Sequence, residues 1–293
     1  MADPSPAGPT SSPALPLSVA LACRNNAATI GRLLDSLAPL GACEIVALDN
    51  GSTDGTIEML ERAGATVIRG QWRGYAKTKQ EVMDACTRPW ILNLDSDESL
   101  EPGLAAAIAD AVRRDVPGIV AYRVNRQTWY RGRPLRHAWQ PEWITRLVQR
   151  GAAEWTGTEP HPRLEVRTGG RIADLGGGEG ANLRHDSFAT FAEHLARQAT
   201  YSRLGAEALF AEGVRGSYLR LLTSPPGAFF KQLVLKRAFL DGPPGWLAAA
   251  TTAAGTLMKH AILIELSQKR AGHAAAQPSE LAPSNAHTPA RPR

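Results

Sequence analysis

Two carboxylates stand one residue apart, directly after an apolar run. Asp95 and Asp97 follow residues 90–94, which predict a buried strand. Ligands of open α/β sheets bind beyond the carboxyl ends of the strands, and Mg²⁺ and Mn²⁺ combine carboxylates with phosphate oxygens. The pair therefore indicates a metal clamp for a nucleotide diphosphate. The alternative is that Ser96 and Asp97 cap a helix beginning near residues 100–102.

A second polar segment, residues 49–56, also closes an expected strand and opens an expected helix. Its sequence is Asp-Asn-Gly-Ser-Thr-Asp-Gly-Thr. Gly51 and Gly55 permit a tight backbone, while Asp49 and Asp54 can accept hydrogen bonds from a base or a ribose. A capped turn without any ligand is the alternative, because Ser, Thr and Asp form such turns readily.

Both segments need a scaffold that brings strand ends together. Short apolar runs alternate with helical periodicity, and strands are expected at 17–23, 44–48, 65–68, 90–94 and 119–124. This alternation predicts an α/β fold with a doubly wound, mainly parallel sheet. From residue 186 to about 270 the pattern is helical, with interruptions expected at 224–227 and 241–245 because of their Pro and Gly residues.

The composition is that of a soluble globular protein, with 43% hydrophobic and 21% charged residues in a chain of 293. A net charge of +5 suits a phosphorylated substrate, an anionic membrane surface or nucleic acid. The three cysteines are widely spaced, which gives no zinc signature and indicates reduced thiols in a cytoplasmic setting. The late apolar stretch 246–258 is too short and too polar to cross a bilayer, so no membrane-spanning segment is expected.

Together, the two polar segments resemble those of family 2 glycosyltransferases of the GT-A fold, which are inverting enzymes that use nucleotide sugars. The likeness is strong over residues 16–125. It implies a divalent cation, Mg²⁺ or Mn²⁺, on Asp97 and Asp95. It also implies a set of donor-binding residues: Cys23, Arg24, Asn25, Asp49, Gly51, Ser52, Asp54, Lys77, Gln80 and Asp95.

A narrower likeness is to the lipopolysaccharide core glycosyltransferases, which include β-1,4-glucosyltransferases acting on inner-core heptose. It is carried by residues 72–80, 95–98, 140–147, 183–188 and 239–242. The resemblance implies a UDP-hexose donor, with UDP-glucose favoured over UDP-galactose or an ADP-heptose. It further implies a lipid-linked or lipopolysaccharide glycan acceptor and a cytoplasmic enzyme, peripheral on the inner membrane. This chain departs from the subgroup's pattern at Ser96, Val148 and Pro162.

Sugar transfer also needs a base for the acceptor hydroxyl, on the side opposite the leaving group. The resemblance makes Glu142 the leading candidate, with Glu98 and Glu159 as alternatives; a surface ion pair of Glu142 with Arg146 is the other interpretation. Further candidates are expected on the acceptor side of the site: Trp139, Trp143, Arg146, His161 and His185.

The expected domains are a disordered leader (1–15), a GT-A catalytic domain (16–185), a helical region (186–270) and a disordered tail (271–293). Within the catalytic domain, residues 16–125 would bind the nucleotide sugar and residues 126–185 the acceptor. Basic residues among the late apolar ones predict amphipathic helices, which either lie on an anionic membrane or pack on the catalytic domain.

Two other functions compete with this interpretation. A sugar nucleotidyltransferase would share the metal site, but such enzymes open with a Gly-rich loop where this chain has Cys23 to Ala27 without glycine. A basic membrane- or nucleic-acid-binding module without catalysis is weaker, because the charge is modest and no recognition motif accompanies it.

Overall fold

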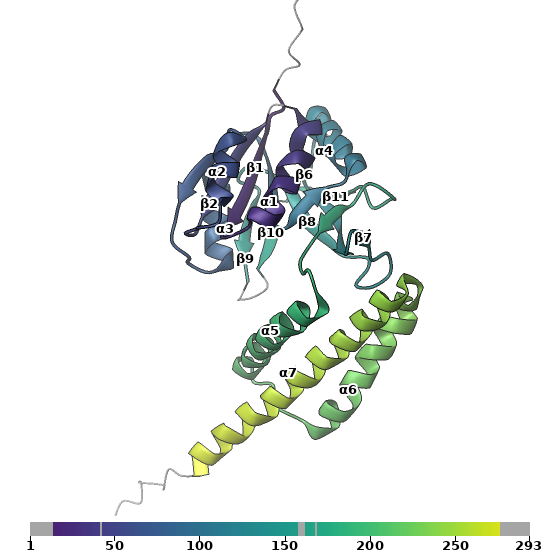
Figure 1. Ribbon diagram of the computed structural model, residues 1–293. Helices are drawn as coiled ribbons and strands as arrows, with labels where there is room; N and C mark the ends of the chain where they lie inside the picture. The colour runs from purple at the N-terminus through teal and green to yellow at the C-terminus, as the bar shows by residue number, and fades with distance from the viewer. Residues whose placement is uncertain (1–13, 42, 158–161, 168, 276–293) are drawn as a thin grey trace, which may run out of the picture.

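The computed structural model describes residues 14–41, 43–157, 162–167 and 169–275. Figure 1 shows an α/β domain and, beside it, a separate layer of long helices formed by the C-terminal part of the chain. The predicted leader and tail therefore lie largely outside the described residues, as do two of the predicted site residues, Glu159 and His161. Leu15, placed in the leader by the sequence, is 4% exposed and belongs to the core.

The centre of the α/β domain is a mostly parallel sheet in the order β3-β2-β1-β4-β8-β6. The first four of these strands run parallel, and β8 is antiparallel to both of its neighbours. The bounds are β1 Leu17–Cys23, β2 Glu44–Asp49, β3 Thr66–Arg69, β4 Trp90–Asp95, β6 Ile119–Tyr130 and β8 Trp143–Gln149. The predicted α/β class and the five predicted strands are confirmed.

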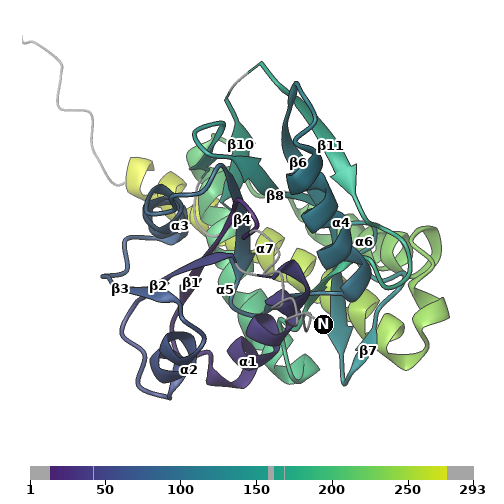
Figure 2. The same cartoon turned by 90° about the horizontal axis from the view of Figure 1, so that it is seen from above.

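Helices cover both faces of the sheet, and the alternation of side chains along β1 explains why. Val19 and Leu21 pack in one core with residues of α1 and α4, whereas Ala20 packs in a second core with residues of α3. Figure 2 shows α3 on one side of the strands and α1 and α2 on the other. The bounds are α1 Ala27–Leu37, a 3-10 helix Ala38–Leu40, α2 Thr56–Arg62, α3 Tyr75–Asp84 and α4 Pro102–Arg114.

The long strand β6 leaves the main sheet and joins a smaller one beside the site. Its second half pairs with β12, which in turn pairs with β5. This pairing brings His185 opposite Glu98, although 87 positions separate them along the chain (185 − 98). The remaining bounds are β5 Glu98–Leu100, β7 Arg133–Pro134, β9 Ala153–Thr156, β10 Arg163–Val166, β11 Arg171–Leu175 and β12 Leu183–His185.

The C-terminal region consists of helices, with α7 lying between α5 and α6 in Figure 1. The bounds are α5 Phe191–Ala211, α6 Tyr218–Phe230, a π-helix η2 Lys231–Leu235, a 3-10 helix η3 Ala238–Asp241 and α7 Pro243–Ala275. Helix α7 thus continues past the predicted boundary at residue 270. The interruption predicted at 241–245 is confirmed, because Gly242 has a φ of 68° between η3 and α7.

The other predicted interruption, at 224–227, is wrong. Helix α6 runs through Pro225 and Pro226, and the chain breaks instead near Arg237, which has a φ of 58°. Proline removes a backbone hydrogen bond and leaves a carbonyl oxygen without its helical donor. No residue of α6 is buried, so solvent can hydrate these carbonyls.

Helix α7 is also longer than the apolar stretch recognised in the sequence. Its segment Pro243–Lys269 is long and apolar enough to cross a bilayer, judged by length and composition alone. The mean hydropathy of its most apolar part is 1.3. The apolar stretch expected at 246–258 is therefore part of a longer apolar helix. Thr251 and Thr252 do not end the helix, because their hydroxyls donate to the carbonyl of Ala248. A third of the most apolar part of this helix is buried within the protein.

Candidate active site

Asp95 closes β4 and lies close to two cations. Lys79 of α3 contacts one carboxylate oxygen, and Nη2 of Arg146, on β8, lies 2.7 Å from the other. Burial alone would raise the pKa of Asp95, but Arg146 and Lys79 outweigh it and hold this pKa well below its usual range. Asp95 is therefore a carboxylate whose two oxygens are already engaged.

The turn after Asp95 is not a helix cap. Glu98 begins β5, and helix α4 starts at Pro102, within the expected range, with Glu101 as its N-cap residue. The alternative interpretation, in which Ser96 and Asp97 cap this helix, is therefore wrong. The tight turn instead leaves Asp97 beside the end of β12, because the backbone N–H of Asp186 donates to the carbonyl of Asp97.

Glu98 is 1% exposed and holds this turn together. Its carboxylate accepts hydrogen bonds from Arg146 at 2.7 Å, from Arg126 at 3.4 Å and from the backbone N–H of Asp95 at 2.9 Å. A carboxylate so enclosed positions the two arginines and has no open side for an acceptor hydroxyl. This geometry argues against Glu98 as the base.

Glu142 is paired with Arg126, a residue that the sequence did not single out. Arg126 donates two hydrogen bonds to the Glu142 carboxylate, at 2.6 and 3.0 Å, and this side chain of Glu142 is 36% exposed. The expected ion pair of Glu142 with Arg146 is not formed, since Arg146 binds Asp95 and Glu98. The helical spacing assumed for that pair does not apply, because residues 143–149 form a strand.

Asp97 lies against His185, with Oδ2 and Nε2 3.5 Å apart. Burial would raise the pKa of Asp97, but His185 lowers it. Burial would likewise lower the pKa of His185, but Asp97 raises it. Among the described residues, Oδ1 of Asp97 has no hydrogen-bond partner, and the side chain remains 26% exposed.

This pair fits a divalent cation. Within the described ranges no three His, Cys, Asp or Glu side chains cluster tightly enough to form a complete metal cage. An Mg²⁺ or Mn²⁺ site in a nucleotide-dependent enzyme does not need one, because such ions keep water and substrate phosphate oxygens as ligands. The Asp97 carboxylate at the rim of the site is a suitable ligand for either ion, and His185 lies beside it.

The second polar segment folds into a tight turn at the end of β2. Asp49 accepts hydrogen bonds from the backbone N–H groups of Gly51, at 2.9 Å, and Ser52, at 3.0 Å. Burial would raise the pKa of Asp49, but these bonds and the Ser52 hydroxyl lower it. Cys23, at the neighbouring strand end, has its Sγ 3.7 Å from Asp49, and burial together with Asp49 raises the pKa of this thiol to about 12.

Side chains tie this turn to the loop after β1. Asp54 accepts from the backbone N–H of Ala27 at 3.0 Å, and Asn25 accepts from that of Thr53 at 2.8 Å. The predicted donor-binding residues of these two loops are therefore neighbours. Arg24, the first residue of the loop after β1, is exposed. The capped-turn interpretation describes the hydrogen bonds correctly and is compatible with a ligand above the turn.

Of the two donor-binding candidates on α3, Lys77 is exposed, whereas Gln80 has a structural contact. Oε1 of Gln80 accepts a hydrogen bond from the backbone N–H of Trp155 at 2.9 Å. Lys79 between them, besides contacting Asp95, lies over the Trp155 ring at 4.5 Å from its centroid.

The acceptor-side candidates are spread over a wider area. Trp139 donates to Thr252 of α7 at 3.0 Å and packs at the junction with the helical region. Trp143 lies under the loop at Gly177, where an added Cβ would come within 2.6 Å of its ring. Arg146 and His185 instead belong to the carboxylate cluster described above.

The mainly parallel sheet, with this set of carboxylates and cations at its strand ends, agrees with the GT-A architecture expected from the sequence. Residues 18–163, which make up most of the α/β domain, match the family model described as glycosyl transferase family 2 and form a domain of that family. The protein is therefore an enzyme that transfers a sugar. The alternatives of a sugar nucleotidyltransferase and of a module without catalysis receive no support from this membership.

Similar proteins span most of the chain. The lipopolysaccharide core biosynthesis glycosyltransferase LpsC of Rhizobium meliloti is 28% identical over 268 residues, which cover 85% of this chain and 95% of LpsC. The uncharacterized glycosyltransferase RP128 of Rickettsia prowazekii is 28% identical over 263 residues, which cover 86% of this chain and 88% of RP128.

Solved structures give partial matches. Glucosyl-3-phosphoglycerate synthase of Mycobacterium tuberculosis, in complex with Mn²⁺ and UDP, is 26% identical with a TM-score of 0.32. That match covers 40% of this chain and 44% of the mycobacterial one, so this chain spans less than half of that enzyme. A second match is the mannosyltransferase PcManGT of Pyrobaculum calidifontis in complex with GDP-Man and Mn²⁺. It is 18% identical with a TM-score of 0.47, and the match covers 94% of this chain and 84% of the PcManGT chain.

Proposed function

We propose that this protein is an inverting, metal-dependent glycosyltransferase that moves a hexose from a UDP-sugar, with UDP-glucose favoured, onto a lipopolysaccharide inner-core glycan. The observation that carries this proposal is the state of the Asp97 carboxylate. Its Oδ2 is paired with His185, and its Oδ1 has no partner among the described side chains. The name of the Rhizobium relative supports the acceptor class, and the match covers 95% of that protein.

In this mechanism, Asp97 and His185 would hold the cation, with Asp95 beside them. Bound there, a divalent cation would neutralise the charge that develops on the departing diphosphate. Lys79 and Arg146 keep Asp95 ionised and in place. The exposed Lys77 adds a positive charge near the phosphates. The loops containing Asn25, Asp49 and Asp54 would bind the nucleoside.

Glu142 is the proposed base. It accepts the proton of the acceptor hydroxyl as that oxygen bonds to the anomeric carbon and the bond from this carbon to the diphosphate breaks. A single displacement of this kind inverts the anomeric centre. Arg126 orients Glu142 through both carboxylate oxygens, and each oxygen retains a further lone pair for the hydroxyl proton.

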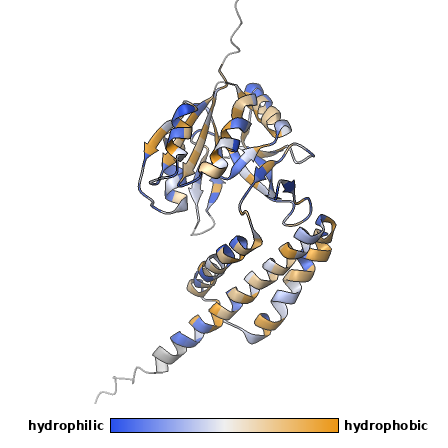
Figure 3. Ribbon diagram, in the orientation of Figure 1, coloured by the Kyte–Doolittle hydropathy of each residue, from blue (hydrophilic) through white to orange (hydrophobic). Residues whose placement is uncertain are grey.

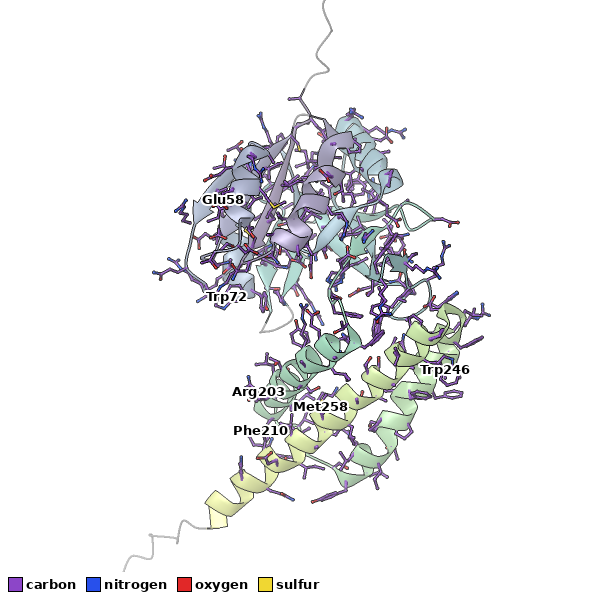
Figure 4. The ribbon with its side chains drawn as sticks, in the orientation of Figure 1. Glu58, Trp72, Arg203, Phe210, Trp246 and Met258 are labelled. Carbon is purple, nitrogen blue, oxygen red and sulfur yellow. The ribbon has the colours of Figure 1, made fainter. Side chains whose placement is uncertain are left out.

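We further propose that the helical region rests on the cytoplasmic face of the inner membrane. The support is an apolar patch, defined as Tyr218, Leu219, Leu222, Phe230, Val234, Leu235, Phe239, Leu240, Trp246 and Leu247, each at least 42% exposed. Figure 3 shows apolar residues along α6 and α7, and Trp246 lies on the outer side of these helices in Figure 4. Basic residues lie among those of the patch, as expected for a surface that meets anionic lipid: Arg220, Lys231 and Lys236.

The function is tested by calorimetric binding of a panel of UDP-, ADP- and GDP-sugars, with and without Mn²⁺. We expect one UDP-hexose to bind only with Mn²⁺, and this binding to be lost in Asp97→Ala. Asp110→Ala is the matched control, because Asp110 forms an exposed pair with Arg114 on α4. A folded protein that binds none of these donors would contradict the proposal.

A further inference from the structure

A cavity lies beside the segment that leads to Glu142. Its volume is about 720 Å³, within the usual range of roughly 300–1,000 Å³ for ligand sites. The second half of β6, the segment before Glu142, the loop at residues 177–180 and the end of η2 form its walls.

The cavity and the carboxylate cluster are on opposite faces of β6. Successive side chains of a strand point to opposite faces. Arg126 contacts Glu98 and Glu142, whereas its neighbours Asn125 and Gln127 line the cavity. The cavity is thus separate from the proposed cation site, and Gln140 and Pro141 in its wall lead directly to Glu142.

The walls are polar and carry no excess charge. Four amide side chains line the cavity: Asn125, Gln127, Gln140 and Asn182. They hydrogen-bond to one another and to the backbone, and the amide nitrogens of Gln127 and Gln140 each keep a second N–H for a ligand. Among the described lining residues, two carboxylates, Glu101 and Glu179, balance two cations, Arg136 and Lys236. Sugar hydroxyls both donate and accept hydrogen bonds, as amides do. A diphosphate would instead require an excess of positive charge.

The cavity also opens toward the apolar patch. Lys236 lines it and donates to the carbonyl of Gln140 at 2.8 Å, and Leu235, which also lines it, is 68% exposed and belongs to the patch. A polar cavity at the edge of an apolar surface suits the glycan part of a molecule whose lipid part stays in the membrane.

We infer that this cavity is a second carbohydrate-binding site, which holds sugars of the acceptor glycan other than the one that receives the hexose. The inference rests on the proposed function, because it takes Glu142 as the point of transfer. An oligosaccharide would lie along Gln140 and Pro141, with its reacting sugar at Glu142 and its remaining sugars among the amides.

Gly178 allows a direct test, because it lines the cavity and a Cβ there would meet no described atom within 4 Å. Its backbone φ is not left-handed, so Gly178→Trp adds a plug without backbone strain. Glu179→Trp is a second, independent plug at a side chain that is 79% exposed. Gly169→Trp is the matched control: its Cβ also meets no described atom, and it does not line the cavity.

The probe is the oligosaccharide of deacylated lipopolysaccharide core, titrated calorimetrically into each protein without donor. We expect the wild type and Gly169→Trp to bind it, and both plug variants to bind at least about tenfold more weakly, which corresponds to about 1.4 kcal/mol. Affinity for the UDP-sugar with Mn²⁺ should stay the same in all four proteins.

Equal oligosaccharide affinity in the wild type and the plug variants would overturn the inference, as would a wild type that binds donor but no oligosaccharide. The donor titration reports separately on the proposed function. If oligosaccharide binding is lost on plugging while no donor binds to any of the proteins, the carbohydrate site stands and the proposed transfer fails.

Discussion

Arg126 determines how the acidic side chains of the site are arranged. It donates to Glu142 and Glu98, and its Nη1 lies 3.9 Å from Asp95. Burial would lower the pKa of Arg126, but Glu142 and Glu98 raise it far above its usual range, so this side chain stays charged. One guanidinium therefore links the proposed base to the carboxylates beside the cation site.

Glu142→Gln tests the proposed base. An amide keeps the size of the side chain but cannot accept the hydroxyl proton, so turnover should fall by at least about a hundredfold. Donor affinity, measured calorimetrically, should stay unchanged, because Glu142 is not assigned to donor binding. Glu165→Gln, an exposed position on β10, serves as the control in the same steady-state assay. Near-normal turnover of Glu142→Gln would contradict the assignment.

Parts of this site are readable from the sequence. Asp49 and Asp95 are recognisable because each ends an apolar run, and the ends of parallel strands share one edge of the sheet. Arg126 is not, because an arginine inside a strand looks the same whether it faces solvent or a carboxylate. His185 reaches Asp97 through the pairing of β12 with β5, a contact between distant segments that no local pattern records.

At the level of elements, Arg146 joins β8 to the turn between β4 and β5. Its side chain is 6% exposed, and it binds Asp95 and Glu98 at 2.7 Å each. The elements themselves were predictable from hydrophobic periodicity. The continuation of α6 through two prolines was not, because it depends on the exposure of that helix.

Arg146→Met should destabilise the fold, since it leaves buried carboxylates with fewer cations. Breaking a buried ion pair typically costs 3–5 kcal/mol, and we expect about 3 kcal/mol here because Lys79 and Arg126 remain as partners. Arg114→Met, which breaks an exposed pair with Asp110, should cost less than about 1 kcal/mol. Urea denaturation of both variants gives their free energies of unfolding. A loss in Arg146→Met that is as small as the loss expected for Arg114→Met would show that Arg146 is not important for stability.

For the whole molecule, the main feature is the attachment of the helical region to the catalytic domain. Asp241 of η3 accepts from the backbone N–H groups of Arg136, His137 and Ala138, at 2.9, 3.0 and 2.7 Å. The next two residues of the same segment are also bound by the helical region. Trp139 donates to the hydroxyl of Thr252, and the carbonyl of Gln140 accepts from Lys236. The sequence predicted both regions but not these contacts, since a lone Asp after a helix gives no sign of its distant partners.

The proposed membrane contact predicts flotation of the wild type with anionic liposomes at low salt. Removing two side chains of the apolar patch, in Leu219→Ser with Leu222→Ser, should lower the partition coefficient at least about tenfold, because each buried leucine contributes about 1.5–3 kcal/mol. Both leucines are 72% exposed, so the fold should tolerate the change. Ile172→Ser, an exposed position on β11, is the control. A wild type that stays in the unbound fraction would rule out the contact.

The anchoring of residues 136–140 by the helices has a kinetic consequence. If α6 and α7 rest on a lipid surface, the anchored segment holds Glu142 at a fixed height above that surface. Such an enzyme meets its acceptors by lateral diffusion, so the relevant concentration is the number of acceptors per unit area. Its rate would then follow how densely the membrane is populated with acceptor, whatever the volume of the surrounding cytoplasm.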